Sequence, residues 1–389
     1  MQRVLVRWSE IGTKSRPVKG RMINQLRDRI RERLAFDGIE GSITPISGRL
    51  VVTTDEAMPA AEALAELPGV ASTSPAIATD PTIQAIETAS DRLSLGSTFG
   101  VDAHVAGDHT FTSPELNQRI GRRLQDRTGA AVDLDEPDTW VEIDVRREAA
   151  YLFTQRFDGP DGFPVGVQRP VAALISGGID SPVAAYEVLT RGAPIVPIYF
   201  YNRPFAAEDH LARFEAVIDK LVRFHPAGDW GYYLVDMADP NEALLEIGRG
   251  RMLLHRRLMF HVAQRIADDE GLAGLVTGEA IGQKSSQTTA NLALTTQGVS
   301  GPIHRPLLTV PKEEITDRAR MLGTFEEAAI PSACRSLAPD SPATTMEPAE
   351  LAALAQQIDF ESQVDTAYRT SDYRPHSNRG QTTPTPETQ

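Results

Sequence analysis

Ser176-Gly177-Gly178-Ile179-Asp180-Ser181 decides the fold of this chain, because it directly follows the apolar run at residues 171–175. That run has the length and composition of a buried strand, and Pro182 stands at a favourable first position of a helix. Glycines let the backbone wrap around an anion, while the first turn of a helix presents unpaired N–H groups and a partial positive charge. The stretch therefore predicts a strand, an anion-binding turn and a helix.

The same turn carries side chains suited to a nucleotide. Ser176 and Ser181 add hydroxyl donors, and Asp180 can hold a Mg²⁺ ion that bridges phosphate oxygens. No Gly-Lys-Ser/Thr follows, so this is not a Walker loop. It resembles the SGGxDS loop of the PP-loop ATP pyrophosphatases, which in that family grips the pyrophosphate released when ATP adenylates a substrate. Ordinary turn chemistry is the alternative, and the flanking strand and helix patterns favour the nucleotide site.

Length and composition indicate a globular protein of two or three domains, with 389 residues of which 41% are hydrophobic. No apolar run approaches membrane-spanning length, and the chain opens into Val4-Leu5-Val6 without a secretory leader. The single cysteine, Cys334, excludes an intrachain disulfide and an all-cysteine metal site built from one chain. These features predict a cytoplasmic protein with no membrane partner.

The net charge of −14 argues against a nucleic-acid partner, because phosphate neutralisation drives such binding. Residues 1–35, however, hold ten Lys or Arg against three Asp or Glu. Lysine is rare, and together with the many Asp and Glu this resembles cytosolic proteins of halophilic archaea. Concentrated salt screens charges within about 3 Å, so the acidity is a weak argument against RNA.

The first 166 residues predict two small α+β units. Residues 1–75 show strands at 4–8, 41–46 and 50–53 and helices at 20–34 and 58–67. The arginines of the first helix are expected on its solvent-exposed face. In the second unit Ser113 is expected to cap a helix with Pro114 at its first position, and residues 141–145 alternate as a half-buried strand.

From residue 167 the pattern alternates between strands and helices, which predicts a parallel sheet covered on both faces. The expected strands are at 171–175, 194–200, 231–235 and 273–278. Residues 369–389 turn to Pro, Thr, Gln and Ser and are predicted to be disordered.

Ligands of parallel sheets lie beyond the carboxyl ends of the strands, and further segments fall there. Tyr199-Phe200 offers an apolar edge to adenine, with a plain core strand equally consistent. Gly278 lies beside a run of small and hydrogen-bonding residues that includes Gln287, which suits close approach to a ligand; a surface loop is the alternative. Arg256-Arg257 is expected at the start of a helix, where the pair either contacts the ligand or is simply exposed to solvent. Lys312 follows a strand in a tight turn, where its charge suits a phosphate transition state, although most lysines are merely exposed.

Together these segments resemble the tRNA 4-thiouridine synthetase family, also called tRNA uracil-8 sulfurtransferases, over roughly residues 1–365. The motifs that carry the resemblance are Glu10-Ile11-Gly12-Thr13-Lys14, Ser113-Pro114-Glu115-Leu116-Asn117, Val132-Asp133-Leu134 with Pro137-Asp138, Gly162-Phe163-Pro164-Val165-Gly166, the SGGIDS loop, Thr277-Gly278-Glu279 with Gly282-Gln283 and Ser286-Gln287-Thr288, and Arg305-Pro306-Leu307.

The resemblance implies an α/β protein with a ferredoxin-like domain at 1–75, a THUMP RNA-binding domain at 76–166 and a PP-loop domain with a Rossmann-like parallel sheet at 167–368. In the family the THUMP domain grips the 3′ acceptor end of tRNA. The PP-loop domain uses ATP to adenylate O4 of uridine 8, and sulfur then displaces AMP. The family also suggests a homodimer, in which one subunit holds tRNA for the other.

Site residues carry over by motif match. Asp180, Lys312 and Cys334 are the expected catalytic residues, with Asp180 as the Mg²⁺ ligand. Lys14, Arg27 and Arg31 are expected at the RNA because they belong to the basic N-terminal segment. The expected ATP contacts are Leu174, Ile175, Ser176, Gly177, Gly178, Asp180, Ser181, Tyr199, Phe200, Arg256, Gly278 and Gln287.

Cys334 matches the family's sulfur-carrying cysteine, and the adjacent Arg335 favours a thiolate. The resemblance implies a persulfide that attacks C4 of the adenylated uridine, whereas a lone cysteine is more often a buried hydrophobe. Some relatives add a C-terminal rhodanese domain that supplies sulfur, and many have a second cysteine where this chain has Ala333. Since neither is present, sulfur is expected from an external donor, either a cysteine desulfurase persulfide or sulfide, and a role in thiamine thiazole synthesis is not expected.

Two other functions remain open on the sequence. One is a PP-loop ligase or amidotransferase that uses ammonia, against which Cys334 and the N-terminal RNA-binding units argue. The other is a non-catalytic THUMP RNA-binding protein, against which intact Asp180, Ser181 and Lys312 argue. The THUMP region also departs from the family, because Asp102 and His104 stand where basic residues are expected.

Overall fold

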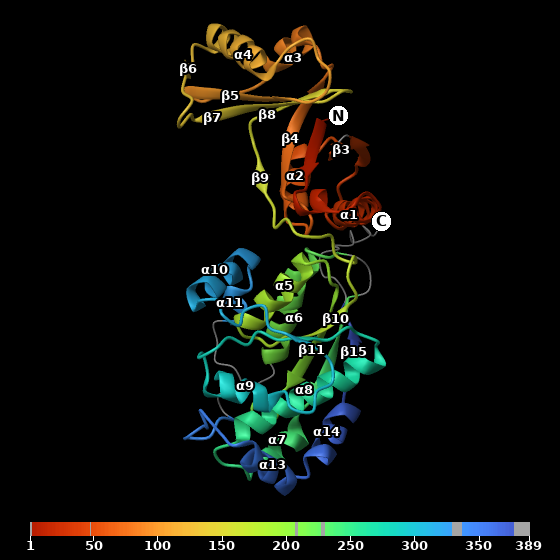
Figure 1. The fold of residues 1–389 in the computed structure, drawn as a ribbon, viewed down its shortest axis with the longest axis vertical. Helices are drawn as coiled ribbons and strands as arrows, with labels where there is room; N and C mark the ends of the chain where they lie inside the picture. The colour runs from red at the N-terminus through yellow and green to blue at the C-terminus, as the bar shows by residue number, and fades with distance from the viewer. Residues whose placement is uncertain (1, 47, 207–208, 227–229, 329–336, 377–389) are drawn as a thin grey trace, which may run out of the picture. The chain divides into compact units, whose positions relative to one another are not determined.

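The computed structural model describes residues 2–46, 48–206, 209–226, 230–328 and 337–376 (Figure 1). The chain forms two compact units, Met1–Pro164 and Val165–Gln389. Within the described residues, no helix is both long and apolar enough to cross a membrane.

The first half of the N-terminal unit has the βαββαβ order of a ferredoxin-like domain, as predicted. Its antiparallel sheet runs β2-β3-β1-β4, and helix α1 buries one apolar face because Met22, Leu26, Ile30 and Leu34 recur at helical spacing. The elements are β1 (Gln2–Arg7), the 3-10 turn η1 (Glu10–Thr13), α1 (Arg16–Phe36), β2 (Ser42–Ile46), β3 (Arg49–Thr54), α2 (Ala57–Ala65) and β4 (Ser72–Thr79).

The second half continues the same sheet through one shared strand. β4 pairs with β1 at Arg3↔Ala76 and then with β8 at Ile77↔Leu152, which gives a nine-stranded sheet. Helices α3 and α4 cover one face of β5, β7 and β8 (Figure 1). The elements are α3 (Ile83–Ser90), β5 (Thr98–Val105), α4 (Ser113–Thr128), β6 (Ala131–Val132), β7 (Thr139–Val145), β8 (Ala150–Phe153) and β9 (Phe157–Asp158).

The start of α4 corrects one expectation. Thr112, rather than Ser113, caps the helix: its hydroxyl accepts from the Glu115 N–H, and the Glu115 carboxylate accepts from the Thr112 N–H at 2.8 Å. This reciprocal capping box needs a Glu three residues after the cap, which Thr112 has. Ser113 is the first helical residue, and its hydroxyl accepts instead from the Val105 N–H at 3.1 Å.

The C-terminal unit is built on a six-stranded sheet in the order β14-β13-β10-β11-β12-β15, parallel except for β15, which confirms the predicted fold class. The elements are β10 (Val171–Leu174), α5 (Asp180–Thr190), β11 (Ile195–Tyr201), α6 (Asp209–Val222), β12 (Gly231–Asp236), α7 (Ala238–Leu245), α8 (Arg251–Asp269), β13 (Leu275–Val276), η2 (Ser285–Gln287), α9 (Thr289–Thr295), β14 (Ile303–His304), α10 (Lys312–Leu322), α11 (Phe325–Ala328), α13 (Pro348–Gln357), α14 (Phe360–Arg369) and β15 (Asp372–Pro375).

Helices cover both faces of this sheet, so its strands are apolar on both sides. Ala172, Ile198 and Val235 pack with residues of α8 and α14 in one core cluster. The alternate side chains face the other layer, where the Tyr199 ring lies 4.5 Å from that of Phe214 in α6. Two-sided burial explains why the strands read as continuous apolar runs.

Two sequence-based boundaries in this unit were wrong. The segment 369–389, expected to be disordered, contains β15, which adds an antiparallel edge strand with Tyr373 opposite Tyr233. Their rings lie 5.3 Å apart, a cross-strand contact that composition does not reveal. Helix α8 begins at Arg251, so Arg256 lies inside the helix rather than at its start.

Ending the chain after Ser371 should lower the free energy of unfolding of this unit by about 2–4 kcal/mol. The β12 ladder would lose its partner, and Trp230 would lose the His376 N–H that donates to its carbonyl at 2.7 Å. Urea unfolding of the shortened chain measures the change. A chain ended after His376 is the control, and equal midpoints for the two would contradict a stabilising role for β15.

Candidate nucleotide-binding site

The Gly-rich turn after β10 is closed by its own serines. The Ser176 N–H donates to the Ser181 hydroxyl at 2.8 Å, and the Gly178 N–H donates to the Ser176 hydroxyl at 3.2 Å. A Cβ added at Gly177 would meet no atom within 4 Å, and the Gly177 N–H has no acceptor among the described residues. The turn therefore leaves open space and a free donor beside the start of α5, which fits a phosphate group.

Gly278 forms a wall of the same turn. Strands β10 and β13 are neighbours, with Ala173 opposite Val276, so residue 278 reaches the turn directly. A Cβ at Gly278 would lie 2.7 Å from the Asp180 carbonyl carbon and 2.7 Å from the Ser181 nitrogen. Only glycine permits this approach of two backbones.

The structure brings Asp180 and Lys312 together across 132 positions of sequence. Lys312 is the first residue of α10, and its Nζ donates to Asp180 Oδ1 at 2.5 Å. Within the described residues, no group of three or more His, Cys, Asp or Glu side chains could hold a metal ion. One carboxylate beside a phosphate site still fits Mg²⁺, which commonly takes one or two carboxylates and completes its shell with phosphate oxygens and water.

A buried carboxylate holds two arginines at this edge. Glu279 is fully buried; its Oε1 accepts from Arg256 and its Oε2 from Arg305, each at 2.7 Å. Arg256 was expected at the nucleotide, whereas no role was assigned to Glu279 or Arg305. The signal available in the sequence was the position of each residue: Arg305 directly follows β14, and Glu279 lies three residues after the end of the adjacent strand β13.

The four hydrophobic residues among the expected ATP contacts have buried side chains. Leu174, Ile175, Tyr199 and Phe200 are each at most 8% exposed, and Phe200 belongs to the core between the sheet and α8. Contact with a nucleotide would therefore use their backbone, and their role at adenine stays a prediction.

Gln287 is also buried, but its polar group is available to a ligand. The side-chain Oε1 has no hydrogen-bond partner within the described part of the chain. A buried amide oxygen without a donor is costly, so it fits a ligand that donates a hydrogen bond there.

A neutral histidine anchors the segment that follows β11. His255 is completely buried, and burial, with a smaller effect of the Arg256 charge, lowers its pKa to about 3. Its Nε2 lies 2.8 Å from Asn202 Oδ1, and Asn241 donates to the Arg203 carbonyl at 2.9 Å. His255 directly precedes Arg256 on α8, so the network fixes the part of the helix that carries Arg256.

The residues expected at RNA belong to the N-terminal unit. The Lys14 ammonium lies over the Phe163 ring, 4.6 Å from its centroid, while Arg31 is exposed on α1 and pairs with Asp28. Arg27 is half-buried on the same helix. Their role at RNA stays a prediction.

The sequence pattern predicted one arginine of α1 on the wrong face of the helix. Arg33, expected in solvent, is buried and pairs with Asp37 at 2.6 Å and Glu66 at 2.9 Å. The two carboxylates neutralise it, and one of them comes from beyond the helix, which helical periodicity does not reveal.

Arginines from other segments of this unit approach the sheet face that carries Asp102 and His104. Arg7, Arg49 and Arg156 line a cleft of about 190 Å³ with those two residues. Burial, together with Arg156 and Arg49, lowers the pKa of Arg7 to about 10. Glu142 and Asp144 line the same cleft and pair with Arg156 and Arg49, so the arginines are balanced by carboxylates there.

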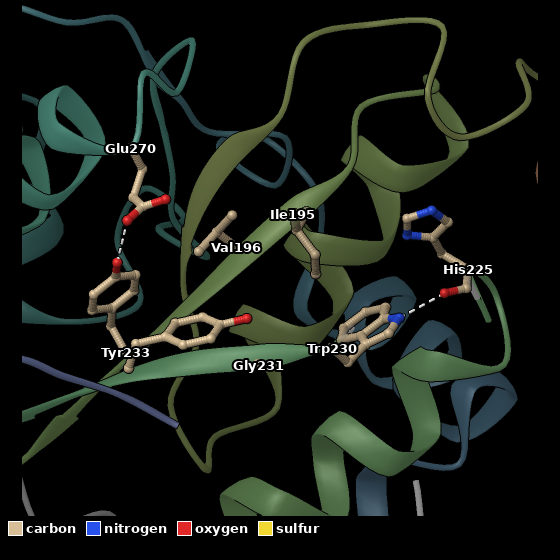
Figure 2. A pocket seen from close by; sticks show the side chains of 8 residues that line it. Ile195, Val196, His225, Trp230, Gly231, Tyr233 and Glu270 are labelled. Carbon is tan, nitrogen blue, oxygen red and sulfur yellow. Dashed lines mark hydrogen bonds between the residues drawn. The ribbon is translucent and has the colours of Figure 1, made fainter. Parts of the chain in front are cut away.

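Cys334, the expected sulfur carrier, lies outside the described residues. A cavity of about 320 Å³ lies at the opposite edge of the sheet, near the first residues of β11 and β12 (Figure 2). Figure 2 shows Tyr233 donating to Glu270 and Trp230 donating to the His225 carbonyl. The length of the strands separates it from the Gly-rich turn, so it is not part of this site.

We expect His255→Gln to flatten the pH dependence of stability. Unfolded His255 takes a proton near its ordinary pKa of 6.5, whereas the folded residue does so only near 3, so its contribution is complete above pH 6.5 and is lost as pH falls toward 3. Between pH 7 and pH 5 the wild type should lose about 2 kcal/mol more than the variant in urea unfolding. Exposed His304→Gln is the control; equal losses in wild type and His255→Gln would contradict the assignment.

Gly278→Ala should weaken ATP binding about tenfold or more, because the added methyl forces β13 away from the Asp180–Ser181 backbone. Isothermal titration with ATP measures the change. The matched control is Gly248→Ala, whose methyl would meet no atom within 4 Å. An unchanged dissociation constant for Gly278→Ala would show that the close approach is not needed for the nucleotide.

Comparison with known families covers most of the chain. The family described as thiamine biosynthesis protein (ThiI) matches residues 166–360, the THUMP domain matches 84–155, and the ThiI ferredoxin-like domain matches 3–74. The first of these spans half of the chain.

Relatives and solved structures agree with these matches. A Halobacterium salinarum protein named "Probable tRNA sulfurtransferase" is 41% identical over 354 residues, 88% of this chain and 89% of its own. The Thermoplasma acidophilum tRNA sulfurtransferase is 34% identical over 370 residues, 93% of this chain and 75% of its own. A crystal structure of a 4-thiouridine synthetase–RNA complex with bound ATP superposes with a TM-score of 0.84 at 28% identity, covering 96% of this chain and 99% of that one. The chain therefore belongs to the ThiI family of tRNA sulfurtransferases.

Proposed function

We propose that this protein converts uridine 8 of tRNA to 4-thiouridine in an ATP-dependent reaction. The observation that carries the proposal is the pairing of Lys312 with Asp180 beside the open Gly-rich turn. An anion-binding turn with a cation at its edge is suited to the transfer of a nucleotide group. The RNA and ATP in the related 4-thiouridine synthetase structure, and the names of the relatives, support tRNA as the partner.

In the first step, uracil O4 attacks the α-phosphorus of ATP. An O4–phosphorus bond forms, the bond to the β-phosphate breaks, and pyrophosphate leaves. The Gly177 N–H and the α5 N-terminus would hold the phosphates, and Lys312 would stabilise the charge that develops on them. Mg²⁺, if held by Asp180 and phosphate oxygens, would neutralise part of that charge.

In the second step, sulfur attacks C4, the C4–O4 bond breaks, and AMP leaves with O4. In one route sulfide itself attacks C4 and becomes the sulfur of 4-thiouridine. If Cys334 attacks as a persulfide, the product is a disulfide between the base and Cys334, and an external thiol must reduce it because the chain has no second cysteine. The proposal therefore includes an external persulfide or sulfide donor.

The proposal also includes a homodimer and a cytoplasmic location. The family resemblance supports the dimer, and tRNA as substrate supports the location. Lys14, Arg27 and Arg31 are proposed to contact the tRNA backbone, because basic side chains supply the phosphate contacts of such complexes.

The deciding experiment is mass spectrometry of nucleosides from tRNA incubated with the protein, Mg-ATP and sulfide. The wild type should form 4-thiouridine, and Asp180→Ala should form none. Cys334→Ser separates the sulfur routes when the assay is repeated with a cysteine desulfurase persulfide in place of sulfide. Loss of product with the persulfide donor but not with sulfide places sulfur on Cys334, because sulfide cannot form a persulfide without an oxidant, and retention with both donors means that Cys334 is not the carrier.

Two results would favour the alternatives. Turnover of ATP with ammonia, independent of tRNA and Cys334, would indicate a ligase or amidotransferase. Tight tRNA binding with no exchange of pyrophosphate into ATP would indicate a non-catalytic RNA-binding protein. Thiolation by Asp180→Ala at the wild-type rate would contradict the role of that carboxylate.

A further inference from the structure

We infer that Arg305 is a further phosphate-binding residue of the nucleotide site, and that Glu279 is the residue that positions it beside Arg256. The inference rests on the proposed use of ATP and adds a residue to that site. It is carried by the charge balance and burial of three side chains: Arg256, Glu279 and Arg305.

The three side chains carry an excess positive charge. Two guanidinium groups share one carboxylate, so their sum is +2 − 1 = +1. Within the described part of the chain, neither arginine has an ion pair with any other carboxylate. The side chains of Glu279, Arg305 and Arg256 are 1%, 18% and 22% exposed, so water screens this charge only in part.

An ion pair built for stability would not have this composition. Burying charge is costly, and one arginine suffices to neutralise Glu279. The second arginine adds desolvation cost without a second carboxylate. An anion that arrives from solution would balance the excess.

Arg305 also has an unused donor. Its Nε donates to Glu279, while its NH2 is buried and has no hydrogen-bond partner among the described residues. A guanidinium group presents donors in a planar fork that suits phosphate oxygens. An orphan donor on a residue with excess charge points to an acceptor that is itself an anion.

The strand topology places Arg305 at the Gly-rich turn. It follows β14 directly, and β14 pairs with β13 at Val276↔His304, so Arg305 lies at the level of Thr277 and Gly278. Gly278 in turn packs against the backbone of Asp180 and Ser181. Lys312, seven residues after Arg305, reaches the same turn through Asp180.

The test compares ligands with and without phosphate on the full chain. Arg305→Gln should weaken binding of ATP and of inorganic pyrophosphate about 10- to 100-fold in isothermal titration, the loss expected for one charge-assisted contact. Its affinity for adenosine should stay within about twofold of the wild type. Arg305→Lys keeps the positive charge but loses the planar pair of donors of the guanidinium group. Its affinity for ATP should lie between those of the wild type and Arg305→Gln.

Stability provides an independent readout. Arg305→Gln leaves the Arg256–Glu279 pair balanced, so its melting temperature without ligand should equal or exceed that of the wild type. Arg265→Gln is the matched control: Arg265 lies on α8 like Arg256 and pairs with Asp365 and Glu361, and its loss should leave ATP affinity unchanged.

Equal weakening of ATP and adenosine binding by Arg305→Gln would overturn the inference, and so would unchanged ATP affinity. A wild type that binds no ATP would overturn the proposed function itself. Wild-type binding of ATP that Arg305→Gln leaves intact would overturn only the role of Arg305.

Discussion

The close approach of Gly278 to the Asp180–Ser181 backbone is the constraint on which the site depends. Two backbones meet there without an intervening side chain, so β13 and the turn after β10 must hold their positions together. Glu279 is thereby set beside the same turn, and its two oxygens orient Arg256 and Arg305. Through Gly278, the pairing of the strands thus determines where Glu279 and its two arginines lie.

The charge of the nucleotide site depends on which charged side chains are buried there, and not on the net charge of the whole chain. The whole chain carries −14, yet Arg256, Arg305 and Lys312 pair at the carboxyl edge of the sheet with two carboxylates, Glu279 and Asp180. A local excess of cations in a partly desolvated edge attracts a polyphosphate more strongly than the same charges in water would. Net charge therefore says little about the ligand of this site.

In the N-terminal unit, too, charged residues distant in sequence are brought together, here by a strand that two halves of one sheet share. Strand β4 belongs to both halves of its sheet, which joins the ferredoxin-like and THUMP elements into one surface. Arg7 and Arg49 from the first half and Arg156 from the second reach a cleft with Asp102 and His104. Glu142 and Asp144 also line this cleft, so its charges balance, and the partners of each charge come from segments distant in sequence.

The sequence by itself determined the fold class, the longer helices and strands and the Gly-rich turn, because periodicity, Gly-Gly and the residues around them act locally. Helix α1 and strands β10 to β12 needed no other information. Only the tertiary structure decided that Glu279 pairs with two arginines, that Arg33 is buried, and that β15 completes the sheet. Strands as short as β13 and β14 carry too little pattern to reveal their register. The partners of a buried charge depend on which strands become neighbours, since residues 256, 279 and 305 meet only after the sheet has formed.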